Sequence, residues 1–188
     1  PEGFQKSAIM PLLDLAQRQV AEEGPFGDKK HGGGWIPRAA MDEIANIVGV
    51  APIKVYEVAT FYSMYNLAPV GKYLVQLCTT TPCWLCGSAS VVDACQDELG
   101  IKIGETTKDG MFTIIEVECL GACVNAPMAQ INDNYYEDLN PDLMKKLLKA
   151  LKKGEDVPVG SQTGRRCSMS AAGPTTLEDQ AKKSGVAG

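Results

Sequence analysis

The chain lacks a long hydrophobic run. No stretch approaches the roughly 18 apolar residues that a membrane-spanning helix requires, because polar residues such as Asn46 and Gln76 interrupt the most apolar segments. We therefore expect no direct membrane span. Residues 1–20 also lack the basic start and the small-residue cleavage site that mark a signal peptide.

Motifs for nucleotide binding and for acid–base catalysis are missing as well. The chain contains neither a G-x-G-x-x-G sequence nor a P-loop, so we expect any nucleotide to be bound by another chain. The acidic residues form no pair typical of acid–base catalysis, and we expect no catalytic residue here. The single histidine, His31, lies in a glycine-rich loop and is interpreted as solvated rather than as a metal ligand.

An excess of positive charge is also absent. The formal net charge is −5, which argues against nucleic acid as a partner. The basic runs are short and scattered, and short runs of this kind are interpreted as solvated faces. They are Lys145-Lys146, Lys152-Lys153 and Arg165-Arg166.

What the chain does have is a composition suited to a folded core and an unusual set of cysteines. Of its 188 residues, 45% are apolar and 22% are charged, which indicates one ordinary domain or a small domain with appendages. The seven cysteines are an odd number and cluster in predicted turns, unlike the framework of a secreted disulfide-rich protein. A metal site in a reducing compartment fits this pattern better.

Residues 7–65 are expected to be mainly helical. Apolar residues recur at intervals of three and four up to Val20, and Gly24 is the predicted stop. A glycine-rich loop is predicted over residues 25–34. Two more helices are expected to open with Pro37 and Pro52 as their first residues, because a first turn tolerates proline. We therefore assign residues 1–66 to an N-terminal helical arm or bundle.

After Gly71 the pattern changes to alternating strands and helices. The expected order is a strand, a helix, a strand, a hairpin and a last helix, over residues 73–77, 88–99, 112–117, 129–136 and 140–154. This order gives one parallel crossover followed by a hairpin, a small thioredoxin-like α/β layer. We assign residues 67–155 to this domain. Residues 156–188 are rich in Gly, Ser, Pro and Thr, and are expected to form an extended tail.

Two cysteine pairs are the most informative feature of the sequence. Cys78 and Cys83 are separated by four residues, Cys119 and Cys123 by three, and each pair follows a predicted strand. Thiolates are soft, anionic donors, and four of them complete the tetrahedra of two bridged irons. The spacing favours a 2Fe–2S cluster over a lone zinc ion. A structural zinc site made of the same four cysteines remains an alternative.

A redox dithiol is a further alternative for one of these pairs. Cys83 and Cys86 form a C-x-x-C motif where a helix is expected to start after a strand. The dithiol interpretation leaves Cys78, Cys119 and Cys123 unexplained, whereas the cluster interpretation leaves only Cys86 without a role. Cys95 falls on the apolar face of its helix and is expected to pack in the core, and Cys167 is interpreted as a surface thiol.

The turns around the cysteines supply backbone donors for sulfur. Backbone N–H groups of Thr79, Thr80, Gly121 and Ala122 are expected to point at the thiolates, and Gly121 is expected to let the backbone approach sulfur closely. Such hydrogen bonds stabilise negative charge on the sulfurs and tune the reduction potential of a cluster.

Five segments carry a resemblance to known proteins. They are residues 55–66, 69–73, 78–83, 116–128 and 131–138. They closely resemble one family, the thioredoxin-like 2Fe–2S subunits of NADH:ubiquinone oxidoreductase, respiratory complex I, and the resemblance covers residues 7–170. It implies an α/β fold, a thioredoxin-like 2Fe–2S ferredoxin domain preceded by an N-terminal helical arm.

The resemblance also implies a function and a site. Cys78, Cys83, Cys119 and Cys123 would be the four ligands of one 2Fe–2S cluster. The chain would be a one-electron transfer subunit in the NADH-oxidising module of complex I, with its cluster close to the FMN of the flavoprotein subunit. That flavoprotein subunit would bind the NADH and FMN. The flavoprotein subunit and the large iron–sulfur subunit would be the partners of this chain.

Residues 164–167 resemble mitochondrial members of the family, which implies the peripheral arm on the matrix side of the inner membrane; a bacterial cytoplasm is the alternative. Cys86 departs from the family, which usually has another residue there, and the loop over residues 22–34 is longer than usual. Three other functions stay open: the equivalent subunit of an NAD-linked hydrogenase or formate dehydrogenase, a thiol oxidoreductase, and a structural zinc module.

Overall fold

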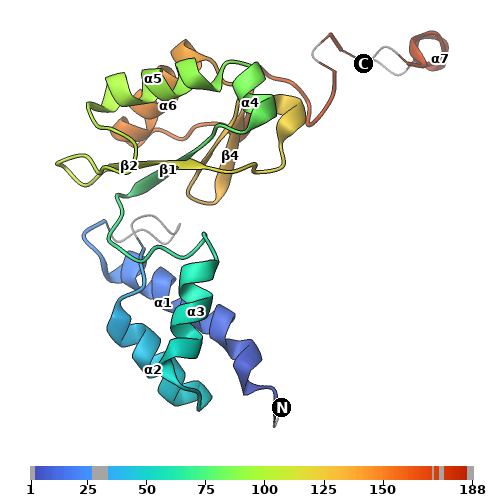
Figure 1. Cartoon of the computed structure of the whole chain (residues 1–188). Helices are drawn as coiled ribbons and strands as arrows, with labels where there is room; N and C mark the ends of the chain where they lie inside the picture. The colour runs from blue at the N-terminus through green and yellow to red at the C-terminus, as the bar shows by residue number, and fades with distance from the viewer. Residues whose placement is uncertain (1–2, 27–33, 171, 174–175, 186–188) are drawn as a thin grey trace. The chain divides into compact units, whose positions relative to one another are not determined.

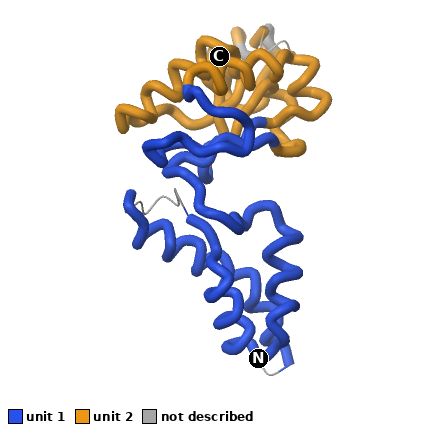
Figure 2. The backbone as a smooth tube through the Cα atoms, turned by 60° about the vertical axis from the view of Figure 1, so that its left-hand side comes forward, with its two compact units in different colours: residues 1–77, 99–116, 130–133 blue, residues 78–98, 117–129, 134–188 orange. Residues whose placement is uncertain are grey.

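The computed structural model describes residues 3–26, 34–170, 172–173 and 176–185. The chain divides into two compact units, coloured separately in Figure 2. The first comprises residues 1–77, 99–116 and 130–133, and the second comprises residues 78–98, 117–129 and 134–188. The sequence-based boundaries after residues 66 and 155 stay a prediction. His31 and most of the predicted glycine-rich loop lie outside the described residues.

A helical arm occupies the N-terminal part of the first unit, as predicted. It consists of η1 (Gln5–Ala8), α1 (Ile9–Glu23), α2 (Arg38–Val48) and α3 (Pro52–Phe61). α1 ends before Gly24 and α3 begins at Pro52, both as expected. The predicted start of α2 was one residue early, because Pro37 keeps the extended ψ of 146° and precedes the helix as its N-cap.

The three α-helices of the arm pack through one shared apolar core. α2 contacts both α1 and α3, and α1 also contacts α3. The buried members of the core are Ile9, Leu13, Ile36, Met41, Ile44, Ala45, Val48, Val55, Ala59 and Tyr65. Those within the helices recur at helical intervals, so burial of one face of each helix holds the arm together, and Ile36 and Tyr65 join the core from the connecting segments. None of the helices in the described part of the chain combines the length and hydropathy that a bilayer crossing demands.

The five strands form one sheet in the order β2-β1-β3-β4-β5. They are β1 (Tyr73–Cys78), β2 (Phe112–Val117), β3 (Ala129–Ile131), β4 (Asn134–Glu137) and β5 (Gly160–Ser161). The N–H of Tyr73, the first residue of β1, donates to the Met111 carbonyl just before β2, so β1 and β2 start at the same end. The N–H of Cys78, the last residue of β1, donates to the Met128 carbonyl just before β3, so β1 and β3 run in opposite directions. The predicted crossover followed by a hairpin is therefore confirmed.

The second unit contains α4 (Thr81–Leu85), α5 (Ser88–Leu99) and α6 (Pro141–Lys153). α5 has the predicted bounds. At the start of α6 the Asn140 side chain accepts a hydrogen bond from the Leu143 N–H at 2.9 Å. At its end Gly154 takes the left-handed conformation with φ 76°. α5 and α6 lie side by side (Figure 1) and are joined by an ion pair between Lys149 and Glu98 at 3.2 Å.

The C-terminal segment contains more regular structure than an extended tail. β5 pairs in parallel with β4, Tyr136 opposite Gly160, and α7 spans Glu178–Ser184. The Gln162 N–H continues the pairing by donating to the Glu137 carbonyl at 2.9 Å. A strand of two residues is too short to produce a recognisable alternation, which is why the sequence pattern does not reveal it.

Candidate metal centre

Four elements bring the paired cysteines to one part of the second unit. Cys78 ends β1, and Cys83 lies in α4, which follows β1 at once. Cys119 comes two residues after the end of β2, and Cys123 opens the short helix η2 (Cys123–Asn125). Cys78, Cys119 and Cys123 therefore lie at or near the end or start of a regular element, and Cys83 lies within the short helix that follows β1.

Local backbone chemistry explains the two turns. Thr80 precedes α4 with the extended ψ of 168°, and Pro82 in the first helical turn brings Cys83 to a buried position, 1% exposed. Between Cys119 and Cys123 the chain turns through Gly121, whose φ of 87° L side chains rarely adopt. A Cβ built on Gly121 would meet no atom within 4 Å. The left-handed turn favours glycine at this position, and the Gly121 backbone also hydrogen-bonds the Cys119 sulfur, in line with the expected approach of backbone to sulfur.

The Thr80 hydroxyl links the two pairs of cysteines. Its Oγ1 lies 3.4 Å from the Sγ of Cys78, and it also hydrogen-bonds Cys119, which helps to lower the pKa of that thiol. Within the second pair, the Sγ atoms of Cys119 and Cys123 are 3.3 Å apart. One hydroxyl therefore interacts with a sulfur from each pair, so the two cysteine motifs meet in space.

The thiols of the second pair have pKa values that diverge. A hydrogen bond from the Gly121 N–H, followed by one from the Cys123 thiol, lowers the pKa of Cys119. The hydrogen bond to Cys119 raises the pKa of Cys123, and burial adds to this. The pair thus favours one thiolate that accepts hydrogen bonds beside one thiol that donates.

The first pair diverges in the same way. Burial opposes ionisation of Cys78, yet hydrogen bonds from the Thr80 hydroxyl, the Cys83 thiol and the backbones of Leu120 and Thr80 together outweigh it and lower the pKa of Cys78. Burial raises the pKa of Cys83 to about 12, and the hydrogen bond to Cys78 acts in the same direction. The negative charges of Cys78 and Cys123 also raise the pKa of Cys83. Cys83 therefore interacts electrostatically with one sulfur of each pair.

Backbone N–H groups around the sulfurs were predicted in part. Hydrogen bonds from the Thr80 and Gly121 backbones to Cys78 and Cys119 are confirmed. The backbone of Leu120 also hydrogen-bonds Cys78, and that of Met128 hydrogen-bonds Cys83. Sequence reasoning missed both, because each donor belongs to a loop distant in sequence from the thiol it serves.

A small apolar cluster surrounds the first pair. The buried side chains of Cys78, Cys83 and Met128 pack together, and partly buried apolar side chains cover them. These are Leu120, Ala122, Ala126 and Tyr135. The Tyr135 hydroxyl donates to the Leu120 carbonyl at 2.8 Å, which fixes the loop between Cys119 and Cys123. One side of the site is therefore shielded from water.

The donor set fits a two-iron centre. Four thiols in two pairs are the soft, anionic ligand set that a 2Fe–2S cluster takes, with two sulfurs for each iron. Within the described ranges no three or more Cys, His, Asp or Glu side chains are gathered as ligands around a single ion. The sulfurs interact within each pair, and the Thr80 hydroxyl links one pair to the other.

The remaining cysteines behave as expected. Cys95 is fully buried in α5, and burial raises its pKa to about 12. Cys86 and Cys167 are exposed. A redox dithiol depends on a lowered pKa at its attacking cysteine. The raised pKa of Cys83 therefore disfavours the dithiol interpretation of Cys83 and Cys86.

Comparison with known proteins gives matches along most of the chain. The family model described as thioredoxin-like 2Fe-2S ferredoxin matches residues 2–152. NADH dehydrogenase (ubiquinone) flavoprotein 2, mitochondrial, of Dictyostelium discoideum is 49% identical over 177 residues, 94% of this chain and 67% of that protein. A subunit of the NADH-quinone oxidoreductase of Rickettsia bellii is 53% identical over 152 residues, 81% of this chain and 83% of that protein.

Solved structures also resemble this chain in fold. One example is the crystal structure of an NAD+-reducing NiFe-hydrogenase in the H2-reduced state, with a TM-score of 0.63. The match covers 80% of this chain and 23% of the hydrogenase chain, at 18% sequence identity. At this level of identity the comparison shows a shared fold.

Proposed function

The chain belongs to the thioredoxin-like 2Fe-2S ferredoxin family, and from this premise we propose that it is the 2Fe–2S electron-transfer subunit of a respiratory complex I. It carries one 2Fe–2S cluster. The NADH dehydrogenase (ubiquinone) flavoprotein 2 and the NADH-quinone oxidoreductase subunit match it at about half of the aligned positions, over most of both chains. The likeness to the hydrogenase is one of fold, so it does not favour the hydrogenase alternative.

The proposed ligands of the cluster are Cys78, Cys83, Cys119 and Cys123. The single observation that carries this proposal is the Thr80 hydroxyl, which hydrogen-bonds a sulfur from each pair. When bound, the cluster accepts and returns one electron at a time. The chain's own residues hold it and adjust its surroundings.

Two features of the site act on the charge of the sulfurs. Hydrogen bonds from the backbones of Leu120, Gly121 and Met128 stabilise negative charge on three of the thiolates. The apolar side chains around Cys78 and Cys83 keep water away and strengthen these hydrogen bonds. Both effects contribute to the reduction potential.

The surface beside the proposed ligands is suited to a protein partner. Trp84 and Leu85 directly follow Cys83 and are 62% and 71% exposed, and Val124 directly follows Cys123 and is 65% exposed. Large exposed apolar side chains are typical of surfaces that a partner covers. The chain is a peripheral subunit of a multi-subunit complex that contains a flavoprotein.

We propose three finer points about that complex. The flavoprotein subunit binds NADH and FMN and lies against this site. The large iron–sulfur subunit is a second neighbour. The complex lies on the matrix side of the mitochondrial inner membrane, which the mitochondrial relative supports.

Reduction of the purified chain by NADH in the presence of its flavoprotein partner tests the proposed function. The two subunits are mixed anaerobically, NADH is added, and samples are frozen for electron paramagnetic resonance (EPR). We expect a rhombic 2Fe–2S signal that requires both the partner and NADH, because this chain has no nucleotide-binding motif of its own.

Two controls make the outcome decisive. The chain with NADH but without the partner should stay EPR-silent, and the chain treated with dithionite should show the full signal. The proposed role would be refuted by a cluster that dithionite reduces fully but that stays oxidised with NADH and the partner. The comparison is made at potentials where a dithionite titration reduces the cluster.

A further inference from the structure

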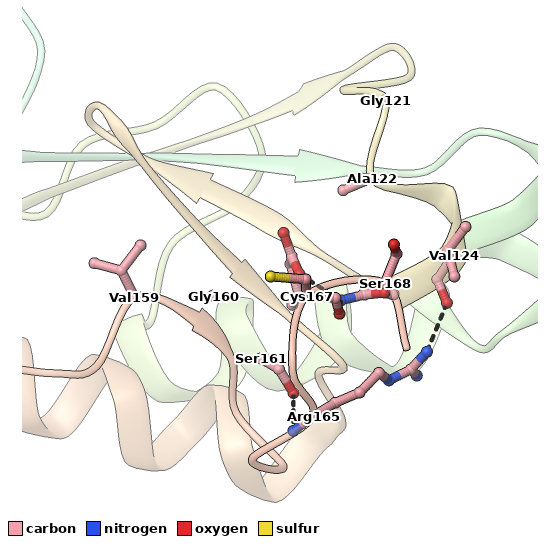
Figure 3. Close-up of a pocket in the computed structure, with 11 residues that line it drawn as sticks. Gly121, Ala122, Val124, Val159, Gly160, Ser161, Arg165, Cys167 and Ser168 are labelled. Carbon is pink, nitrogen blue, oxygen red and sulfur yellow. Dashed lines mark hydrogen bonds between the residues drawn. The ribbon is translucent and has the colours of Figure 1, made fainter. Parts of the chain in front are cut away.

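The C-terminal segment folds back onto the loop that carries Cys123. We call residues 160–169 the C-terminal strap. The strap and the cysteine loop line opposite parts of a cavity of about 470 Å³ (Figure 3). The loop contributes Gly121, Ala122, Val124 and Asn125, and the strap contributes Gly160, Ser161, Arg165, Cys167 and Ser168. The strap is thus a direct neighbour of the candidate metal centre.

A largely buried ion pair anchors the strap. The Arg165 guanidinium contacts the Asp138 carboxylate, and their side chains are only 15% and 6% exposed. The Ser161 hydroxyl donates to the second carboxylate oxygen of Asp138 at 2.6 Å. Ser161 Oγ in turn accepts a hydrogen bond from the Arg165 N–H at 3.1 Å. The interpretation of Arg165 as a solvated basic residue was therefore wrong.

The same guanidinium reaches the cysteine loop. Its Nη1 donates to the Val124 carbonyl at 3.1 Å, drawn as a dashed line in Figure 3, and to the Met169 carbonyl at 3.3 Å. Val124 is the residue after Cys123. One cation therefore joins a buried carboxylate, the strap and the backbone beside a proposed ligand.

Asn125 provides a second attachment between the strap and η2. Its Nδ2 donates to the Cys167 carbonyl at 2.8 Å and to the Glu137 carboxylate at 2.6 Å. The Asn125 carbonyl accepts a hydrogen bond from the Asp138 N–H at 2.8 Å. Asp138 has a φ of 55°, a left-handed conformation that residues other than glycine seldom adopt. The hydrogen bond and the ion pair together hold it there.

We propose that Arg165 and Asp138 are positioning residues that hold Cys123 and set the local charge at that end of the cluster. The inference rests on the proposed function, since it assigns to the strap a role at the same site. In a low-dielectric surrounding, a charge acts on its neighbours far more strongly than it does in water. Each partner of this buried pair cancels the charge of the other, so loss of either one exposes the cluster to an uncompensated charge.

The two charges make opposite predictions. Reduction adds an electron, so a nearby negative charge disfavours it and a nearby positive charge favours it. Arg165→Gln leaves the Asp138 carboxylate unpaired, and we expect a lower reduction potential. Asp138→Asn leaves the guanidinium unpaired, and we expect a higher reduction potential. A purely structural role of the ion pair would give no reason for the two variants to shift the reduction potential in opposite directions.

The test is a redox titration of the full chain followed by EPR. Arg166→Gln is the matched control, because it removes the same formal charge from the exposed neighbour of Arg165. We expect its reduction potential to stay close to that of the wild type. Shifts of the same sign in Arg165→Gln and Asp138→Asn would overturn the inference. So would a shift in Arg166→Gln as large as that in Arg165→Gln.

Loss of one partner from a buried pair can prevent folding. If a single variant does not fold, the double variant Asp138→Asn/Arg165→Gln tests the positioning role instead, because it leaves no unpaired charge. We expect the double variant to bind the cluster, with a lower melting temperature and broader EPR lines than the wild type. A melting temperature and EPR lines equal to those of the wild type would contradict the positioning role. A wild-type chain without a 2Fe–2S signal would instead refute the proposed function, so the two failures are distinguishable.

Discussion

Cys123→Ala is expected to yield a colourless chain without a 2Fe–2S EPR signal. Cys123 lies 3.3 Å from Cys119, sulfur to sulfur, and its charge reaches Cys83, so it belongs to the group of four sulfurs. Alanine offers no donor in place of the thiolate, and a cluster that loses one of four ligands has an incomplete tetrahedron at one iron. We expect iron to fall from about two per chain to near zero, measured by metal analysis and visible absorption.

Two other cysteines serve as matched controls for this substitution. Cys86 is exposed just beyond α4, and Cys95 is fully buried in α5. Cys86→Ser and Cys95→Ala should both keep the full visible spectrum, although Cys95→Ala removes a core side chain and so costs some stability. Full absorption in Cys123→Ala would show that the ligand set is wrong. Loss of colour in Cys86→Ser would point to Cys86 as a ligand instead.

Removal of the iron is expected to destabilise the second unit. The sulfurs come from two separate loops, and the first pair packs with Met128 beneath Leu120, Ala122, Ala126 and Tyr135. Metal binding is coupled to folding where the ligands come from separate loops, so the bound metal stabilises their native arrangement. We expect the free energy of unfolding to fall by at least about 3 kcal/mol, or roughly 6–12 °C in melting temperature.

Calorimetry before and after treatment with an iron chelator and a reductant measures this effect. The matched control is Cys123→Ala, which has no cluster to lose and should melt at the same temperature with and without the chelator. Equal melting temperatures of the iron-loaded and iron-free wild type would mean that the loops are already rigid without metal.

Much of the fold follows from local sequence patterns. The bounds of α5 and the caps of α6 were predicted because Gly100, Asn140 and Gly154 mark helix ends by their own backbone and side-chain chemistry. The thioredoxin-like α/β architecture was predicted from the order of strands and helices. β5 was missed, because a strand of two residues is stabilised by its pairing with β4 rather than by any pattern of its own.

The candidate site was likewise predicted only in part from the sequence. The meeting of the two cysteine pairs follows from their positions after predicted strands, since turns at the ends of neighbouring strands converge. The contact between Arg165 and Asp138 does not follow, because they lie 27 positions apart in the sequence and only tertiary structure buries both side chains. An arginine in a short basic run is more often solvated, and nothing local distinguishes Arg165 from its exposed neighbour Arg166.

Metal and sulfide analysis of the purified wild-type chain tests most directly whether the four cysteines hold a 2Fe–2S cluster. Iron, acid-labile sulfide and zinc are quantified in one anaerobic sample, and EPR spectra are recorded after reduction with dithionite. We expect about two irons and two sulfides per chain, with a rhombic EPR signal from a single unpaired electron. One zinc per chain with neither sulfide nor signal would contradict this expectation.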